Sequence, residues 1–228
     1  MTRTTNARLA GFTFLFYIAV AFPSLVLFNR ATSGQGTAAK LANIAQHASG
    51  VRVAIVLTLL GSFSALVLAV ALYGITRDED RELAVLALAC RVGEGLLSAI
   101  SLPTMLGLLW LATAGAGAGS PDAATSNALG AFLLMPDWPI AAIFFAVGST
   151  IFSWLLLRGR MVPVPLAGLG VLASILLVVA LPLHLAGFLK GPVTGSIYMY
   201  MPMLVFEAAL ALWLLIKGVA PIRSINFP

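Results

Sequence analysis

Charged residues are scarce in this sequence. Only 9% of its 228 residues are Asp, Glu, Lys or Arg, whereas 61% are hydrophobic. A soluble domain carries about 25% charged residues. So few charges cannot cover a surface that faces water, and the composition therefore excludes an ordinary soluble enzyme. It indicates that lipid is the solvent for most of the chain.

The sequence contains one cysteine, Cys90, which excludes an internal disulfide and a paired-cysteine metal site. There is also no glycine-rich phosphate loop, no Gly-x-Ser-x-Gly elbow and no His-Glu-x-x-His motif. These absences leave the question of enzyme activity open and favour a negative answer. They also indicate no particular cofactor.

Nucleic acid is excluded as a partner despite a formal charge of +5. Of the 13 Lys and Arg residues, all but Arg91 are dispersed at the ends of hydrophobic segments, and they form no basic stripe. Basic residues at helix ends are typical of membrane topology. The predicted partner is the lipid bilayer.

Hydrophobic segments of about 20 residues, the length that a membrane-spanning helix needs, occur six times. They cover residues 9–28, 53–75, 83–114, 138–157, 161–183 and 197–216. The first has no small-residue cleavage site after it and is read as a retained helix, not a signal peptide. We predict an all-α, polytopic membrane helix bundle with six transmembrane helices, forming a single domain over residues 1–228.

Three further features qualify this pattern. The third segment is too long for one straight crossing, and Pro103 is expected to kink it. The longest connection, residues 29–52, is predicted to contain a surface helix over 37–49, with Leu41, Ile44 and Ala48 on one face. Residues 123–135 are predicted to form a short helix at the membrane interface.

The basic residues predict the orientation. Eight lie on one side of the predicted membrane and four on the other. The side with eight is therefore expected to be cytoplasmic. Both termini then lie in the cytoplasm and the 29–52 connection lies outside. The eight are Arg3, Arg8, Arg77, Arg81, Arg158, Arg160, Lys217 and Arg223, and the four are Arg30, Lys40, Arg52 and Lys190.

Short motifs along nearly the whole chain resemble those of a bacterial membrane-protein family, domain of unknown function 4386. They are Ala7-Arg8-Leu9-Ala10-Gly11, Ala42-Asn43-Ile44, Leu72-Tyr73-Gly74, the pair Arg91 and Glu94, Leu156-Leu157-Arg158-Gly159 with Pro163, Glu207, Leu212-Trp213-Leu214, and Lys217-Gly218. The resemblance implies six helices in a bacterial inner membrane. It implies no activity, because none is assigned to the family.

Three ionisable residues lie within the hydrophobic segments and are the candidate ligand or proton site. Arg91 and Glu94 lie in the third segment and Glu207 in the sixth, at similar predicted depths. A charge at mid-bilayer costs at least about 2.5–3.5 kcal/mol, so these groups should face the interior and pair. We expect a structural ion pair between Arg91 and Glu207. Glu94 is then expected to be a neutral carboxyl that donates a hydrogen bond to Ser98 or a backbone carbonyl.

Arg91, Glu94 and Ser98 recur at helical spacing, which places them on one stripe of the third segment. One Arg and two Glu carry a net charge of −1 when all are ionised, and a proton or a cation would balance it. Structural clamping is the alternative explanation for the same residues.

A metal site is not expected. The secondary candidates are His184, Met199 and Met203, because imidazole and thioether groups suit Cu(I). Methionines that fill gaps between helices explain the same pattern more simply.

Three functions remain open on the sequence alone. The favoured one is a protein that binds or carries a small apolar or amphipathic molecule at the Arg91, Glu94 and Glu207 site. The second is a non-catalytic accessory subunit that packs against partner membrane subunits. The third is an intramembrane enzyme acting on lipid or quinone, which lacks support because no nucleophile or metal triad accompanies the carboxylates.

Overall fold

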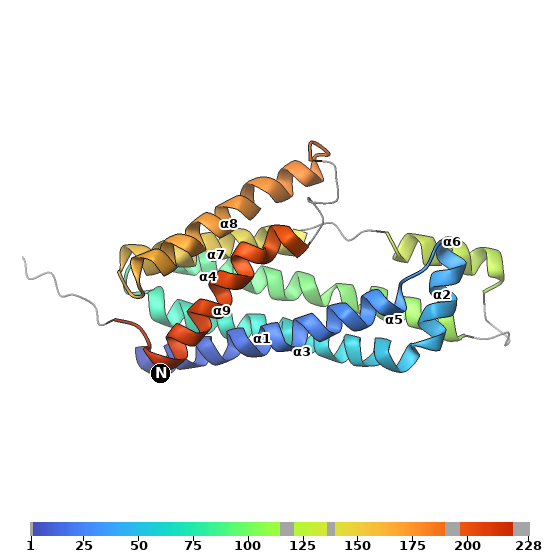
Figure 1. Cartoon of the computed structure of the whole chain (residues 1–228), viewed down its shortest axis with the longest axis horizontal. Helices are drawn as coiled ribbons and strands as arrows, with labels where there is room; N and C mark the ends of the chain where they lie inside the picture. The colour runs from blue at the N-terminus through green and yellow to red at the C-terminus, as the bar shows by residue number, and fades with distance from the viewer. Residues whose placement is uncertain (1, 115–120, 136–139, 190–196, 221–228) are drawn as a thin grey trace, which may run out of the picture. The chain divides into compact units, whose positions relative to one another are not determined.

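The computed structural model describes residues 2–114, 121–135, 140–189 and 197–220. Within these ranges the regular structure is helical, without strands. Five helical stretches are long and apolar enough to cross a membrane, and a shorter apolar helix of 16 residues follows them (Figure 1). The predicted all-α membrane helix bundle is confirmed.

The helices begin and end close to the predicted segments. In chain order they are α1 (Arg3–Ala31), α2 (Thr37–Gln46), α3 (Ala48–Thr76), α4 (Arg81–Ala99), α5 (Ser101–Thr113), α6 (Ala123–Leu133), α7 (Ile140–Arg158), α8 (Val164–Leu185), the 3-10 helix η1 (Ile197–Tyr200) and α9 (Met201–Ile216). The predicted start of the fourth segment at Trp138, and the basic residues Lys190 and Arg223, lie outside the described residues.

The third predicted segment is interrupted, as expected from its proline. Helix α4 ends at Ala99 and α5 begins at Ser101. Pro103 has no N–H to donate to the carbonyl four residues earlier, which belongs to Ala99, and its ring clashes with that carbonyl. The break therefore falls one turn before the proline.

The connection predicted over residues 29–52 is more helical than expected. Helix α1 continues to Ala31 and α3 begins at Ala48, so both helices extend beyond the hydrophobic segments. Only residues 32–36 and 47 stay outside helices. The predicted surface helix corresponds to α2, with Leu41 and Ile44 buried. It is shorter than predicted, because it ends at Gln46 and Ala48 belongs to α3.

The chain divides into two compact units. The first comprises Met1–Phe16, Phe63–Gly95 and Pro139–Pro228. Its core is one cluster of apolar side chains from α1, α3, α4, α7, α8 and α9. Helices α7 and α8 run side by side, and α9 packs against α8 (Figure 1). The single domain predicted from the sequence remains a prediction.

The two ends of the described chain meet within this first unit. The Nε of Arg3 donates a hydrogen bond to the carbonyl of Ile75 at 2.9 Å, and its Nη1 reaches the carbonyl of Ala220 at 3.5 Å. The backbone N–H of Ala220 donates to the carbonyl of Met161 at 2.9 Å. The start of α1, the end of α3, the turn before α8 and the segment after α9 therefore lie together.

Surface charges join two turns at this same end. The Nε of Arg158, at the end of α7, lies 3.2 Å from Glu79, and its Nη1 lies 3.3 Å from Asp80. Both carboxylates belong to the connection between α3 and α4. These contacts agree with the prediction that the two connections share one side of the membrane.

The second unit comprises Tyr17–Ser62 and Leu96–Trp138. Helix α2 packs against α5 and α6, with its apolar face in a small buried cluster. The amide of Asn43 donates to the carbonyl of Arg30 at 2.8 Å and ties α2 to the end of α1. Residues 123–133 form the predicted short helix, α6, which Asp122 caps by accepting a hydrogen bond from the N–H of Thr125.

Candidate functional site

Arg91 and Glu94 form a buried ion pair on one face of α4. The Nη1 of Arg91 lies 2.9 Å from Oε2 of Glu94, three residues later on the same helix. Arg91 is 1% exposed and Glu94 is 3% exposed. Residues three apart are neighbours on a helix surface, so α4 itself supplies the geometry of the pair.

This ion pair differs from the predicted one. The carboxylate within 4 Å of Arg91 belongs to Glu94 and not to Glu207, in the part of the chain that the structure describes. The structure therefore lacks the predicted direct ion pair between Arg91 and Glu207. Glu94, which was expected to be the neutral carboxyl, is the group that pairs with Arg91. The physical reason is proximity: Glu94 reaches the guanidinium within its own helix, whereas Glu207 needs a favourable rotation of α9.

Side chains of helix α7 also contact Arg91. The Nη1 of Arg91 donates to Oγ of Ser149 at 3.4 Å, and its Cζ lies 4.8 Å from the centre of the Phe145 ring. A Cβ atom at Gly148 would lie 3.0 Å from Cγ of Arg91. The glycine therefore lets the stem of the arginine lie against α7, while the ring and the hydroxyl contact its charged end.

Two of the three guanidinium nitrogen atoms of Arg91 take no part in these contacts. Nε and Nη2 are buried and have no hydrogen-bond partner among the residues that the structure describes. These two atoms form one edge of the planar guanidinium, and their N–H groups point the same way. An edge of this kind binds acceptor oxygens, with two parallel hydrogen bonds when the acceptor is a carboxylate. Buried donors without a partner are costly, so this edge is poised for an acceptor.

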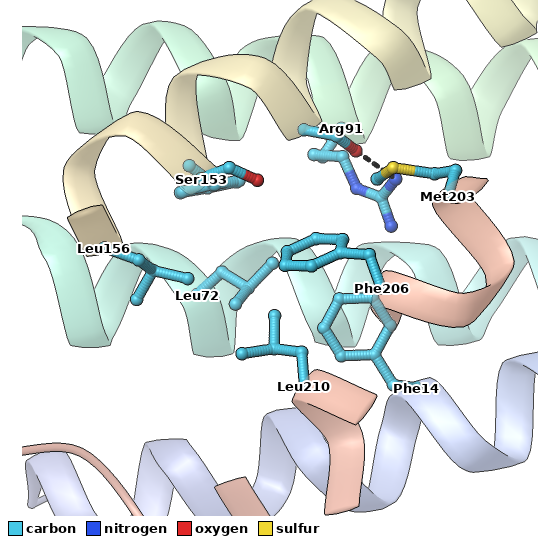
Figure 2. A pocket seen from close by; sticks show the side chains of 10 residues that line it. Phe14, Leu72, Arg91, Ser153, Leu156, Met203, Phe206 and Leu210 are labelled. Carbon is cyan, nitrogen blue, oxygen red and sulfur yellow. Dashed lines mark hydrogen bonds between the residues drawn. The ribbon is translucent and has the colours of Figure 1, made fainter. Parts of the chain in front are cut away.

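A small cavity lies beside the guanidinium. Its volume is about 10 Å³, which is room for one water-sized group. Figure 2 shows Arg91 directed toward Met203 and Phe206 of α9, with Phe14 and Leu210 farther along the same lining. The lining residues are Phe14, Leu72, Arg91, Ser149, Phe152, Ser153, Leu156, Met203, Phe206 and Leu210. The cavity is therefore apolar except for the guanidinium and two serine hydroxyls.

Glu207 lies on α9 and is 5% exposed. Its Oε1 is buried and has no hydrogen-bond partner within the described part of the chain. It lies within electrostatic reach of both Arg91 and Glu94. The structure thus brings the three predicted intramembrane charges into one region of the first unit. The roles of the two glutamates differ from the prediction, because Glu94 pairs with Arg91 and Glu207 does not.

A comparison with protein families identifies the chain. The family model described as domain of unknown function (DUF4386) matches residues 9–218. The chain belongs to this family. Searches of curated proteins and of solved structures found no match.

Two glycines from the short motifs of this DUF4386 member named in the sequence analysis lie at close helix contacts. A Cβ at Gly11 would lie 2.7 Å from the carbonyl oxygen of Ala211, so α1 and α9 approach closely there. Gly74 on α3 lies against the side-chain amide of Asn6, which would have to shift to admit a larger residue. These motif positions therefore belong to the packing of the helices around the site.

The remaining predicted site residues have other surroundings. Ser98 belongs to the second unit, where its carbonyl accepts a hydrogen bond from Oγ of Ser101 at 2.7 Å. Met203 lines the cavity and Met199 packs against the apolar core. His184 has its Nδ1 3.2 Å from the carbonyl of Leu189. The described chain contains no group of three or more His, Cys, Asp or Glu side chains that could hold a metal.

Sequence reasoning missed several residues of this DUF4386 site. Phe145 and Gly148 were not singled out, although with Ser149 they follow at the spacing of one helix face. Phe14 and Phe206 also escaped notice, because an aromatic residue in a hydrophobic segment has no distinguishing pattern. Their positions at the cavity depend on how α1 and α9 pack.

Proposed function

We propose that this DUF4386 protein is a multi-pass protein of the bacterial inner membrane that binds a small amphipathic molecule at Arg91. The observation that carries the proposal is the free edge of the guanidinium. Its Nε and Nη2 are buried, have no partner among the described residues and lie beside an apolar cavity. The family resemblance and the bias of basic residues support the membrane assignment.

The chemistry of the site selects the head group. The free edge of Arg91 donates hydrogen bonds and accepts none, so the ligand must present an acceptor. A cavity of about 10 Å³ admits one oxygen atom of a carbonyl or hydroxyl group but not a phosphate group. A ketone, a quinone carbonyl or a similar neutral head therefore fits better than a phospholipid head group.

The apolar tail of the ligand would lie against α9. Met203 and Phe206 form that wall of the cavity, and both are 2% exposed. Entry of a tail requires one of these side chains to change rotamer. Methionine has three rotatable bonds and adapts to irregular spaces, so Met203 is the side chain expected to move.

The test compares 2-decanone with decane on purified protein in detergent. Both probes partition into micelles, but only the ketone has an acceptor oxygen. We expect the ketone to raise the thermal unfolding midpoint and decane to leave it nearly unchanged. Arg91→Lys keeps a positive charge beside Glu94 but removes the planar edge, and it should lose the effect of the ketone.

The matched control is Arg158→Lys, at the surface ion pair with Glu79. This variant should respond to the ketone as the wild type does. An equal response to decane and 2-decanone, or a full response in Arg91→Lys, would show that the free edge of Arg91 does not bind the head group.

A further inference from the structure

The charges of the site do not balance. Arg91, Glu94 and Glu207 are each at most 5% exposed. Arg91 is always positively charged and its ion pair with Glu94 is neutral as a whole. An ionised Glu207 would leave a net charge of −1 in a low-dielectric region, where an unbalanced charge costs several kcal/mol. Glu207 is therefore the group whose charge must depend on what else occupies the site.

The charged neighbours of Glu207 come from α4. Arg91 and Glu94 are the groups that act on it electrostatically. Within the described residues of the first unit, the other elements around α9 bring titratable side chains only toward their ends or outside this lining, and the thiol of Cys90 on α4 is also outside it. These side chains are Arg3 and Arg8 on α1, Tyr73 on α3, Arg158 on α7, His184 on α8 and Tyr200 on η1. Arg91 is thus the cation available to an ionised Glu207.

Donors and acceptors in this region match one another. In the part of the chain that the structure describes, Arg91 has two buried N–H-bearing nitrogen atoms without a hydrogen-bond partner, and Glu207 has one such buried oxygen atom. A carboxylate is the preferred partner of a free guanidinium edge. Glu207 lies within electrostatic reach of Arg91, so a rotation of α9 or a rotamer change of Glu207 is the movement that would bring an ionised Glu207 to that edge. A ligand head group that occupies the edge would deny it to Glu207.

We propose that an ionised Glu207 and the head group of the ligand compete for the Nε and Nη2 edge of Arg91, so that ligand binding is coupled to uptake of one proton by Glu207. This inference rests on the proposed function and specifies its regulation. With the ligand bound, Glu207 takes a proton from water and is neutral. With the edge empty and the pH high enough to ionise Glu207, the proton passes to water and the Glu207 carboxylate binds Arg91.

The first test measures the affinity for 2-decanone from mildly acidic to mildly alkaline pH. Competition by one deprotonation lowers the affinity as pH rises, by at most about tenfold per pH unit. Glu207→Gln cannot ionise, so it should bind the ketone with an affinity that does not change with pH. Glu79→Gln, a carboxylate variant at the surface pair with Arg158, is the matched control and should keep the wild-type dependence.

The second test needs no ligand. Infrared spectra should contain a protonated-carboxyl band that disappears as pH rises and is missing from Glu207→Gln. Addition of 2-decanone at a pH where the band has faded should restore it in the wild type. Absence of a titrating band assigned to Glu207 would overturn the coupling whether or not the ketone binds.

The two proposals fail in different ways. Binding of the ketone that does not change with pH, or a pH dependence that persists in Glu207→Gln, overturns the coupling and leaves the binding function standing. Failure of the ketone to bind the wild type and Glu207→Gln at every pH overturns the binding function itself.

Discussion

The guanidinium of Arg91 and the carboxylate of Glu94 lie 2.9 Å apart on one helix, with side chains that are 1% and 4% exposed. Removing one partner of such a pair leaves a buried charge without compensation and costs about 3–5 kcal/mol. Arg91→Met and Glu94→Met should each lower the folded yield in detergent. The double variant should recover much of the loss, because two apolar side chains leave no charge behind.

Surface ion pairs provide the comparison for this cycle. Arg158 is 49% exposed in its bridges to Glu79 and Asp80, and pairs of this kind contribute about 0–1 kcal/mol. Arg158→Met should therefore have little effect on yield. A double variant at Arg91 and Glu94 that is no better than the worse single variant would show that the pair is not the source of the loss.

The surroundings of two glycines on α8 predict opposite effects of substitution by alanine. A Cβ at Gly170 would collide with the ring of Phe206 and lie 2.7 Å from Oγ of Ser153, whereas nothing lies within 4 Å of one at Gly168. Gly170→Ala should destabilise the protein by about 1–3 kcal/mol through overpacking. Gly168→Ala should be neutral or stabilising, by up to about 1 kcal/mol, because alanine favours helix.

The unfolding midpoint in detergent measures this difference. Gly170→Ala should also weaken the response to 2-decanone, since both Phe206 and Ser153 line the cavity. Equal midpoints for the two alanine variants would show that α8 and α9 are not in the close contact described.

A polar contact joins two helices of the second unit. Oγ of Ser24 on α1 lies 2.8 Å from Oγ1 of Thr58 on α3 and donates to the carbonyl of Ala54 at 2.9 Å. Ser24→Ala, Thr58→Val and the double variant should reveal a coupling of about 0.6 kcal/mol, and at most about 1.7. Unfolding midpoints measured as a cycle give this value.

Thr113→Val is the control for this cycle. The hydroxyl of Thr113 donates to the carbonyl of Leu109 in its own helix, at 2.8 Å. It joins no second helix and should show no coupling to Ser24. Additive effects of Ser24→Ala and Thr58→Val would indicate that their contact contributes nothing to stability.

Orientation in the membrane is testable with single cysteines in a Cys90→Ala background. Gln35 and Asp78 are both exposed, in the connections after α1 and after α3 respectively. A membrane-impermeant thiol reagent applied to intact cells should label Gln35→Cys and leave Asp78→Cys unlabelled, because the basic residues predict a cytoplasmic side for the latter. The reverse pattern would invert the topology.

Helix α6 should lie at the membrane interface, as its sequence predicts. Phe132 is 68% exposed, and a large apolar side chain in that state is stable where lipid can cover it. A spin label at Phe132→Cys should be accessible to oxygen, which concentrates in lipid. A label at Asn127→Cys should instead be accessible to a water-soluble nickel complex. Equal access of the nickel complex to both sites would place α6 in water.

The sequence alone determined the class of fold and the approximate bounds of the helices. Lipid offers no hydrogen bonds, so each long hydrophobic segment must satisfy its backbone internally as a helix. The interruption near Pro103 was equally predictable, since a missing N–H has a local effect. The three intramembrane charges also stood out, because such residues are rare in hydrophobic segments.

Only the tertiary structure decided which of these charges pair. The Arg91–Glu94 contact lies within one helix, so the sequence offered Glu94 as a partner of Arg91. It offered Glu207 equally, and which glutamate pairs with Arg91 depends on the rotation of α9. That rotation is set by close packing, with Phe206 against Gly170 and Ala211 against Gly11. Such contacts join residues far apart in the chain, and hydropathy carries no information about them. The free edge of Arg91 follows from the same packing, because it remains only where no neighbouring helix brings an acceptor.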